Sequence, residues 1–396
     1  MEKIKILGVN ISKLTGDAAK TIGGLLEDGR KHLVVTVNPE MLLAAAKDEE
    51  FYYILNRADL ALADGVGLVF AAWAMGKNIK RITGADLVKD VFKLAEEKKL
   101  KVSILNWEKS LSKNNDIEKT LKDRYGKLAF EVITVNRDHN KMDKEASGEI
   151  IFTNLGAPFQ EKLIYHHLKN WKNARLAIGV GGALDFLTGK IKRAPKIMRL
   201  LGLEWLWRLA IEPKARFRRI INAVIVFPFR FIVWRFVNPF RYRPNVACLA
   251  YKKENGGYKI IIVERTGEPG HWQLPQGGID NMKIENAALK ELYEELGSEK
   301  FKVNKIYKNI YRYKFGQRKE EPKEYALMSQ KHRGHKGQSQ SLAVAEFIGS
   351  DSDIKINYWD HSAWKWVSPE KLVKEVFISR REATGIFLEK FRETAK

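Results

Sequence analysis

The sequence predicts two α/β domains in one chain. Its 396 residues are too many for one ordinary core, and its hydrophobic content of 45% is that of a globular protein. Strand-like apolar runs alternate with helical patterns through the first two hundred residues, which favours a largely parallel sheet. A second alternation begins at Asn245, where strand patterns flank a hairpin turn at residues 255–257. Two prolines interrupt regular structure between these regions, so we expect domains at residues 1–240 and 241–396.

The elements of the first domain follow from their patterns. Strands are expected at residues 33–37, 101–105, 149–155 and 175–180, and residues 39–56 have a helical pattern. The first residues alternate and carry charge, so no signal peptide is visible and we expect a cytoplasmic protein. The single cysteine, Cys248, excludes an internal disulfide, and its apolar strand pattern favours core packing.

Positive charge is concentrated in the middle of the chain. Residues 151–250 carry +14 of the net charge of +22, and residues 213–243 combine eight basic residues with many large apolar ones and no acid. The longest uncharged stretch there, residues 220–229, is ten residues, whereas a membrane-spanning helix needs about 20. We therefore expect a basic appendage, residues 204–240, that lies on an anionic membrane surface without crossing it. A buried amphipathic helix that docks on the first domain is an alternative, as is an RNA-binding segment with aromatic stacking groups.

Four polar or glycine-containing clusters each follow, or lie close to, a predicted strand, where α/β proteins bind their ligands. Any one of them could be only a turn. Together with segments 193–195, 202–208 and 212–213, they resemble the WecB/TagA/CpsF glycosyltransferase family from about residue 5 to about residue 235. The four clusters are Thr36-Val37-Asn38-Pro39-Glu40, Ala63-Asp64-Gly65-Val66-Gly67, residues 155–161 and residues 179–186.

The resemblance implies a Rossmann-like domain that passes an N-acetylmannosamine-type sugar from UDP, with inversion, to a polyprenyl-diphosphate-linked sugar at the cytoplasmic membrane face. It implies that Thr36 and Asn38 belong to the sugar and acceptor site and that Asp64 is the base. It further implies a nucleotide pocket with contributions from Gln160 and from the 179–185 turn, which contains Gly181, Gly182 and Asp185.

The chemistry of an inverting transfer agrees with this assignment. A carboxylate must take the proton of the acceptor hydroxyl, and positive charge must stabilise the departing UDP. Residues 1–240 contain no Asp-x-Asp pair to hold a metal, so we expect arginines to supply that charge. Two departures from the family are Asn106-Trp107-Glu108, in place of a glycine-rich turn, and Ala215, in place of an arginine. The available cluster is Arg208, Arg216, Arg218 and Arg219.

The segment from residue 272 to residue 297 joins a glycine turn to an acidic helix. Glu291, Glu294 and Glu295 stand three and four apart, so a helix stacks them on one surface, with leucines 289, 292 and 296 on the opposite one. Converging carboxylates suit Mg²⁺, although a solvated acidic face would show the same spacing. Gly277 and Gly278 in the turn can bring bare backbone close to a ligand.

These residues resemble the Nudix box. Their sequence is most similar to that of the RNA pyrophosphohydrolase and dinucleoside polyphosphatase branch of the Nudix superfamily. The resemblance implies an α/β/α sandwich in which Glu291, Glu294 and Glu295 hold Mg²⁺ or Mn²⁺, and in which Asp360 is a downstream catalytic acid. It also implies that Arg265, Gly277 and Gly278 bind substrate. The departures are a loop one residue short after Gly277, Met282 in place of the first glutamate of the box, and Lys290 in place of its arginine.

We therefore interpret the chain as a bifunctional enzyme, peripheral on the inner face of the cell membrane. The expected partners of its first domain are a UDP-sugar, a polyprenyl-diphosphate-linked acceptor and anionic lipid. Its Nudix domain is expected to bind a nucleotide or a capped or triphosphorylated RNA end, and the sequence is also compatible with an oligomer. Two alternatives are a weakly active Nudix domain that senses nucleotides, and a chain that is mainly an RNA 5′-pyrophosphohydrolase. Residues 315–340, including His332 and His335, are expected to form a solvated loop.

Overall fold

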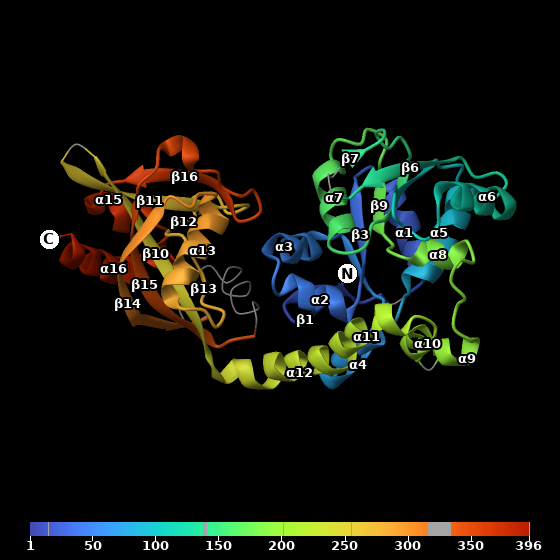
Figure 1. The fold of residues 1–396 in the computed structure, drawn as a ribbon, viewed down its shortest axis with the longest axis horizontal. Coiled ribbons are helices and arrows are strands. Elements are labelled where there is room, and N and C mark those ends of the chain that lie inside the picture. Colours follow the sequence, from blue (N-terminus) through green and yellow to red (C-terminus); the bar gives the residue numbers. More distant parts are fainter. Residues whose placement is uncertain (15, 138–140, 201, 255, 316–333, 396) are drawn as a thin grey trace. The chain divides into compact units, whose positions relative to one another are not determined.

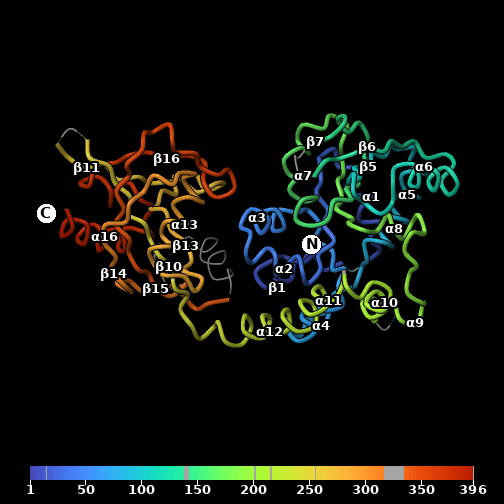
Figure 2. Tube along the Cα trace, in the orientation of Figure 1, coloured from blue at the N-terminus to red at the C-terminus, as the bar shows by residue number. Residues whose placement is uncertain are grey.

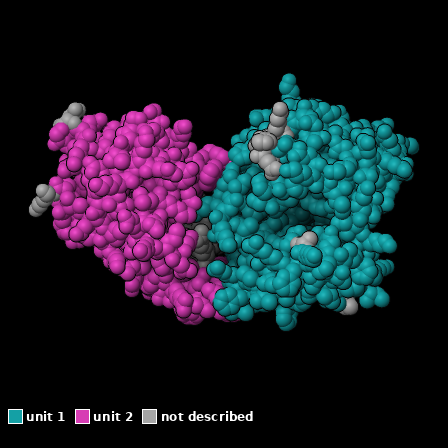
Figure 3. Space-filling model, viewed as in Figure 1, with its two compact units in different colours: residues 1–232 teal, residues 233–396 magenta. Residues whose placement is uncertain are grey.

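The computed structural model describes residues 1–396 except 15, 138–140, 201, 255, 316–333 and 396 (Figure 1). It divides into two compact units, Met1–Ile232 and Val233–Lys396 (Figure 3). The division falls inside a helical segment, eight residues before the boundary of 240 expected from the prolines. Each unit is described by itself.

The first unit is built on a seven-stranded sheet with the order β4-β3-β9-β8-β5-β6-β7 (Figure 1). All neighbours are parallel except β6 and β7, so the predicted parallel sheet is confirmed. The strands are β3 (His32–Val37), β4 (Leu60–Ala63), β5 (Val102–Trp107), β6 (Phe130–Asn136), β7 (Lys141–Met142), β8 (Ile150–Asn154) and β9 (Leu176–Gly179).

Helices cover both faces of this sheet, which explains why every residue of its strands β3, β8 and β9 is buried. Helices α1 (Ala18–Glu27), α5 (Gly84–Glu97), α6 (Asn114–Arg124) and α8 (Ala183–Leu187) share one buried cluster with alternate strand residues. Helix α7 (Phe159–His167) packs against β3, β8, β9 and α3. A separate hairpin, β1 (Lys3–Ile6) and β2 (Val9–Ser12), forms a two-stranded sheet.

The helical pattern predicted at residues 39–56 is two helices, α2 (Pro39–Ala45) and α3 (Glu49–Arg57). The break occurs because Asp48 caps the second helix, and its Oδ1 accepts a hydrogen bond of 2.9 Å from the Phe51 amide. Helix α4 (Val66–Ala74) follows β4.

The basic appendage is helical. It comprises α9 (Lys196–Leu200), α10 (Glu204–Ile211), α11 (Pro213–Ile221), η1 (Asn222–Val226), α12 (Phe227–Ile232), η2 (Val233–Val237) and η3 (Asn238–Phe240). Pro228, in α12, has no N–H to donate to a helical hydrogen bond. The wider π-type turn of η1 lies immediately before this helix. The described residues include one helix, Arg216–Phe240, that is long and apolar enough to cross a membrane by length and composition, with a mean hydropathy of 1.8 and 11% burial. The argument that ten uncharged residues exclude a crossing was therefore wrong.

The second unit is a sandwich of helices around a seven-stranded sheet (Figure 1). Its strands are β10 (Tyr242–Glu254), β11 (Gly257–Arg265), β12 (Trp272–Gln273), β13 (Gln276–Gly278), β14 (Phe301–Lys314), β15 (Gly337–Phe347) and β16 (His361–Val367). The path is β12-β11-β10-β15-β14, with β13 paired to β10 and β16 to β11, and only β10 and β15 are parallel.

Strand β10 shows how the two faces of this sheet are used. Val246, Cys248 and Ala250 point to the cluster that includes α13 (Ile284–Leu296). The alternate residues 247, 249 and 251 point to the cluster that includes α15 (Pro369–Glu375) and α16 (Arg381–Thr394). The predicted α/β/α sandwich and the core position of Cys248 are both confirmed.

One prediction about loops was wrong. Residues 337–340 belong to strand β15, because they pair in parallel with residues 242–245 of β10. Most of the predicted loop, including His332, lies outside the described residues. Two short 3-10 helices, η4 (Asp351–Asp353) and η5 (Ile378–Arg380), complete the unit.

Candidate functional sites

The four polar clusters of the first unit lie at the carboxyl ends of four neighbouring strands. Asp64 follows β4, Asn38 follows β3, the turn with Gly181 follows β9, and Gln160 opens the helix after β8. Since these strands are parallel, their carboxyl ends share one edge of the sheet, where α/β proteins bind ligands. Segments far apart in the sequence thus form one candidate site.

The loops that carry Asp64 and Asn38 are packed directly together. The Asp64 amide donates to the Val37 carbonyl at 2.8 Å, and a Cβ on Gly65 would lie 2.4 Å from Pro39 Cδ. Glycine is therefore required next to Asp64 because the proline ring occupies the space of a side chain. Asn38 Oδ1 caps helix α2 by accepting a hydrogen bond from the Met41 amide at 3.1 Å.

Thr36 is buried at the end of β3, where its Oγ1 donates to the Gly179 carbonyl at 3.1 Å. This bond joins the ends of β3 and β9. The predicted sugar-site residues Thr36 and Asn38 therefore each have one polar atom engaged in holding the site together.

Asp64 has the electrostatics of a base that works near neutral pH. It is half-buried, and desolvation raises the pKa of its carboxyl to about 6, although the positive charge of Arg81 opposes the rise. Arg81 Nε donates to the Asp64 carbonyl at 3.0 Å, and its Nη2 donates to Glu204 at 3.2 Å. Our sequence-based site lacked Arg81 and named Glu204 only within a motif, because neither stands next to Asp64 in the chain.

Gln160 fixes the turn after β9. Its Oε1 accepts a hydrogen bond of 3.0 Å from the Gly181 amide, and its Nε2 donates to Glu161 Oε1 at 2.7 Å. Glu161 is fully buried, and its Oε2 has no hydrogen-bond partner among the described residues. Burial raises the pKa of this carboxyl to about 7, against the lowering effect of Gln160. A Cβ on Gly179 would lie 2.6 Å from Gln160 Nε2, so a side chain there would displace Gln160 from the turn.

Asp185 is directed to the loop after β5. Its Oδ1 accepts hydrogen bonds from the Ser112 amide at 3.0 Å and from the Ser112 hydroxyl at 2.6 Å. Asn106 donates to the Ser112 carbonyl at 2.9 Å, and its Oδ1 accepts from Asn154 at 2.9 Å. A buried polar network thus replaces the glycine-rich turn that the family pattern predicts at this point.

Beside this network, Arg137 lies between two aromatic rings. Its guanidinium carbon is 3.9 Å from the Trp107 ring centroid and 4.5 Å from that of Phe159. Arg137 follows strand β6, and no sequence signal that we used could have placed it between these rings.

Three of the four predicted phosphate-binding arginines influence one another. Desolvation, together with the charges of Arg216 and Arg219, lowers the pKa of Arg208 to about 10. Two of them already have acidic partners, since Arg216 Nε is 3.0 Å from Glu212 and Arg219 Nε is 2.6 Å from Glu40. Arg208 lies 4.8 Å from the Phe186 ring centroid, next to the turn after β9. The fourth, Arg218, is exposed.

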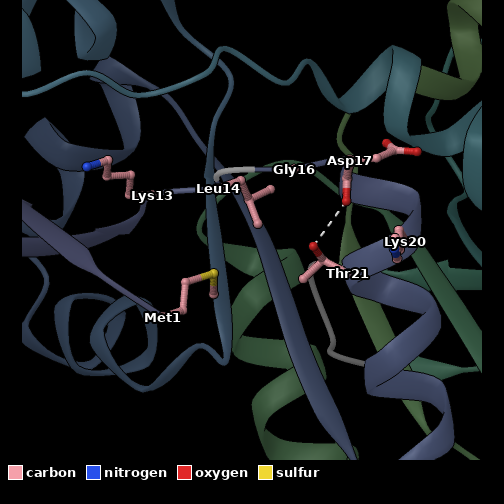
Figure 4. Close-up of a pocket in the computed structure, with 7 residues that line it drawn as sticks. All are labelled: Met1, Lys13, Leu14, Gly16, Asp17, Lys20 and Thr21. Atoms are coloured by element: carbon pink, nitrogen blue, oxygen red, sulfur yellow. Dashed lines mark hydrogen bonds between the residues drawn. The ribbon is translucent and has the colours of Figure 1, made fainter.

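A cavity of about 370 Å³ in the first unit lies elsewhere, beside the start of α1 (Figure 4). Its one drawn hydrogen bond runs from Thr21 Oγ1 to the Asp17 carbonyl, at 3.0 Å. None of the predicted site residues lines this cavity, so it is separate from the candidate site.

The glutamate helix of the second unit is α13, and it touches the glycine turn directly. Glu291 and Glu295 are buried, which argues against a merely solvated acidic face, whereas Glu294 is partly exposed. A Cβ on Gly277 would lie 1.9 Å from the carboxyl carbon of Glu291, and the Gln276 amide donates to Glu295 Oε1 at 3.3 Å. The absence of a side chain at residue 277 makes room for a carboxylate.

Basic side chains hold two of these glutamates. Lys290 Nζ is 2.5 Å from Glu294 Oε2, and His361 Nε2 is 3.0 Å from Glu295 Oε2. Burial alone would lower the pKa of His361, but Glu295 raises it above its usual value. Within the described residues, no group of three His, Cys, Asp or Glu side chains is arranged to hold a metal ion. In the structure Lys290 and His361 thus occupy carboxylate oxygens of Glu294 and Glu295, and the predicted metal-ligand set stays a prediction.

The donor chemistry of this helix nevertheless fits a divalent cation. Its carboxylate oxygens are the ligands that Mg²⁺ prefers, and two of the three carboxylates are already buried. Met282, at the first glutamate position of the box, packs on the apolar cluster under α13 instead of offering an oxygen.

The remaining predicted residues lie around this helix. The Asp360 amide donates to Asn357 Oδ1 at 2.9 Å, and Asn357 Nδ2 donates to the Glu294 carbonyl at 2.6 Å, so the loop of Asp360 is tied to α13. Arg265 is directed to Glu268, at 3.3 Å. A Cβ on Gly278 would lie 2.2 Å from Arg243 Nη2, which brings Arg243, a residue that we did not predict, to the glycine turn.

The two sites define a two-part enzyme: a parallel α/β domain with a carboxylate of raised pKa, joined to an α/β/α sandwich with a glutamate helix. Residues 4–240 match the glycosyl transferase WecG/TagA/CpsF family, and the chain belongs to this family. Residues 241–385 match the NUDIX domain, so the chain is a glycosyltransferase fused to a Nudix hydrolase.

Two relatives illustrate the two parts. The N-acetylglucosaminyldiphosphoundecaprenol N-acetyl-beta-D-mannosaminyltransferase of Bacillus subtilis (strain 168) is 31% identical over 196 residues, which are 48% of this chain and 75% of the relative. The RNA pyrophosphohydrolase of Wolbachia sp. subsp. Brugia malayi (strain TRS) is 34% identical over 165 residues, which are 39% of this chain and 93% of the relative. Among solved structures, a C. elegans Ap4A hydrolase binary complex matches with a TM-score of 0.28 and 19% identity, over 38% of this chain and 98% of that one.

Proposed function

We propose that the first domain transfers an N-acetylmannosamine-type sugar from UDP to a polyprenyl-diphosphate-linked sugar, with inversion and without a metal ion. The product would be a precursor of a surface polysaccharide or wall polymer. The name of the Bacillus subtilis relative supports these substrates. The observation that carries the proposal is Asp64, whose carboxyl has a pKa of about 6 at the ligand-binding edge of the sheet.

In this mechanism the Asp64 carboxylate takes the proton of the acceptor hydroxyl. The acceptor oxygen then bonds to the anomeric carbon of the donor sugar, and the bond from that carbon to UDP breaks with the electron pair going to UDP. Arg208, with Arg216 and Arg219 near it, stabilises the charge on the departing diphosphate. Arg216 and Arg219 are paired with Glu212 and Glu40 in the structure. Their side chains must therefore leave these acids and turn toward the diphosphate when it binds.

The test is transfer by the full-length protein between UDP-sugars and a polyprenyl-diphosphate-linked acceptor. Asp64→Asn should lower kcat by roughly 100-fold or more, the scale of a lost general base. Asp123→Asn is a matched control, since Asp123 is exposed on α6 of the same domain. Unchanged turnover in Asp64→Asn would remove this residue from the mechanism.

We also propose that residues 204–240 bind the cytoplasmic face of the membrane peripherally. Phe227 and Phe231 are buried, and α12 packs against α2 and α4, so part of this helix is covered by protein. A helix with one side against a folded domain cannot be surrounded by lipid, although its length would permit a crossing. Extraction of the membrane-bound protein by alkaline carbonate is expected, and retention in the lipid pellet would indicate a spanning helix.

RNA is the competing partner for this basic segment, and two binding assays separate the possibilities. Flotation with vesicles that contain anionic lipid should recover the protein, while a gel shift with single-stranded RNA should show no complex at the same ionic strength. The reverse result would favour the RNA-processing alternative.

For the second domain we propose hydrolysis of a nucleoside polyphosphate, a nucleoside diphosphate derivative or a capped or triphosphorylated RNA end, dependent on Mg²⁺ or Mn²⁺. Glu291, Glu294 and Glu295 would hold the metal, which when bound polarises phosphate oxygens and acidifies a water molecule. Asp360, on a loop tied to α13, would accept a proton from the attacking water if that loop closes. The name of the Wolbachia relative supports RNA ends as one substrate class.

Comparison of wild type with Glu294→Gln at high enzyme concentration tests this proposal. The variant should lose hydrolysis by at least roughly 100-fold. Glycosyl transfer should stay unchanged, because Asp64 and its neighbours belong to the other unit. Equal background rates of both proteins on all these substrates would instead support a nucleotide-sensing module, which the substitutions at Met282 and Lys290 favour.

A further inference from the structure

Helix α4, which follows Asp64, exposes two large aromatic side chains. Phe70 is 65% exposed and Trp73 is 76% exposed, three residues apart on the same helix. The helix contains no charged residue. Exposed aromatic residues of this size on an uncharged helix mark a surface that binds something.

The same helix packs against the basic appendage. Helix α4 packs against α12, and the two lie beside each other in Figures 1 and 2. The Phe227 ring lies against Gly67, since a Cβ there would be 3.5 Å from Phe227 Cε1. Because Phe227 fills this interface, α4 and α12 are held together as one element of the first unit.

The appendage carries its own exposed apolar residues next to this interface. Phe217, Ile225 and Phe229 are each more than 60% exposed. Residues 213–232 contain five basic residues and no acid. Large apolar side chains together with unopposed cations match the interface of an anionic bilayer, where acyl chains meet phosphate groups.

We propose that α4 is a second membrane-binding helix, and that with α11 and α12 it forms one surface on which Phe70 and Trp73 enter the bilayer interface. The inference rests on the proposed membrane association of the appendage and extends it to the helix that follows the base. Only Gly65 separates Asp64 from the start of α4. Contact of α4 with lipid would therefore bring the base close to the diphosphate and first sugar of a membrane-anchored acceptor.

Site-specific labelling can test this surface, because the one cysteine of the chain, Cys248, is buried. Phe70→Cys, Trp73→Cys and Phe229→Cys would each carry a polarity-sensitive fluorophore in the full-length protein. Leu111→Cys is the control, since Leu111 is 53% exposed on the loop after β5. Vesicles of phosphatidylglycerol and phosphatidylcholine with a bromine-labelled acyl chain serve as the probe.

The expected result is a blue shift and bromine quenching at positions 70, 73 and 229, with neither at position 111. Quenching at 229 alone would overturn the α4 proposal while leaving the appendage on the membrane. No quenching at any position would overturn the proposed membrane association itself. A blue shift at 70 and 73 without vesicles, growing with protein concentration, would show that a second copy covers this face and would also overturn the proposal.

Kinetics supply an independent measurement. Phe70→Ser/Trp73→Ser should raise KM for a polyprenyl-linked acceptor in vesicles by about tenfold or more, equivalent to losing about 1.4 kcal/mol of binding. KM for the UDP-sugar should stay the same, and so should KM for a short-chain acceptor in solution. An equal rise for the long-chain and short-chain acceptors would mean that the substitutions disturb Asp64 and that α4 does not bind lipid.

Discussion

At the scale of single residues, the carboxyl groups of Asp64 and Glu161 differ in how deeply they are buried, and we expect different roles for them for this reason. Asp64 and Glu161 both have raised pKa values, but Asp64 is half-buried at the site whereas Glu161 is enclosed beneath it. The family resemblance singled out Asp64, and the structure shows that it follows strand β4, which the sequence patterns did not predict. The resemblance gave no sign of Glu161 as an ionisable group with an unpartnered oxygen, since that depends on side chains from other segments.

The pH dependence of glycosyl transfer should follow Asp64. Since a pKa of about 6 describes the free protein, kcat/KM should fall about tenfold per pH unit below pH 6. The measurement is initial rates between pH 4.5 and pH 8 with the acceptor well below its KM, so that the rate reports kcat/KM. A profile that stays flat down to pH 4.5 would show that this carboxyl keeps the usual pKa of an aspartate in the free protein.

Glu161 should make stability depend on pH. Its folded pKa of about 7 lies above the usual value, so between roughly pH 4.3 and pH 7 the folded chain keeps a proton that the unfolded chain has lost. Stability due to this group is therefore lost as pH rises through that window. Glu161→Gln should be more stable than wild type at pH 8 by up to roughly 3 kcal/mol, with a much smaller difference at pH 4.5.

Urea unfolding of the first-domain transition at both pH values checks this prediction. Glu97→Gln, at an exposed position near the end of α5, should show no such pH-dependent difference. The same pH dependence in Glu161→Gln and wild type would show that Glu161 does not control stability over this range.

At the scale of elements, the sequence predicted strands and helices well where one local pattern decides them. The buried strands β3, β5, β8 and β9 and the glutamate helix α13 lie where their apolar runs and spacing placed them. Strand β4 was missed because its four residues are too short to show a period. Strand β15 begins within a polar segment predicted as loop, because pairing with β10 outweighs its weak local pattern.

The glycine turn and α13 make a prediction at this scale. Gly277→Ala places a methyl group 1.9 Å from the Glu291 carboxyl carbon, so the Glu291 carboxylate must move away from the turn. Hydrolysis should fall by roughly 100-fold or more, since a small displacement of a catalytic group carries this cost. Gly385→Ala in α16 is the matched control, because nothing lies within 4 Å of its added methyl, and should stabilise the domain by about 1 kcal/mol. Equal hydrolysis by both variants would refute close contact between the turn and the Glu291 carboxylate.

At the scale of the whole molecule, one chain contains two candidate sites that use different groups to balance the negative charge of phosphates. The candidate transferase site relies on fixed cations, namely Arg208 and its neighbours, to balance a departing diphosphate. The candidate hydrolase site instead has three glutamates, two of them buried, whose partners in the structure are Lys290 and His361. Family resemblance placed both sites in the sequence. It could not reveal these partners, because they depend on the fold and on residues peculiar to this chain.

This difference predicts that chelation separates the two activities in a single preparation. With excess EDTA, hydrolysis should fall by roughly 100-fold or more, because loss of a cation worth several kcal/mol leaves the phosphate charge uncompensated. Glycosyl transfer should remain, because guanidinium groups stay charged whether or not a metal is present. Both rates are measured on the same full-length protein, with Mg²⁺ or Mn²⁺ restored at the end to show that the loss is reversible. Transfer that disappears with EDTA and returns with metal would mean that the first site also requires a cation, despite the absence of an Asp-x-Asp pair in residues 1–240.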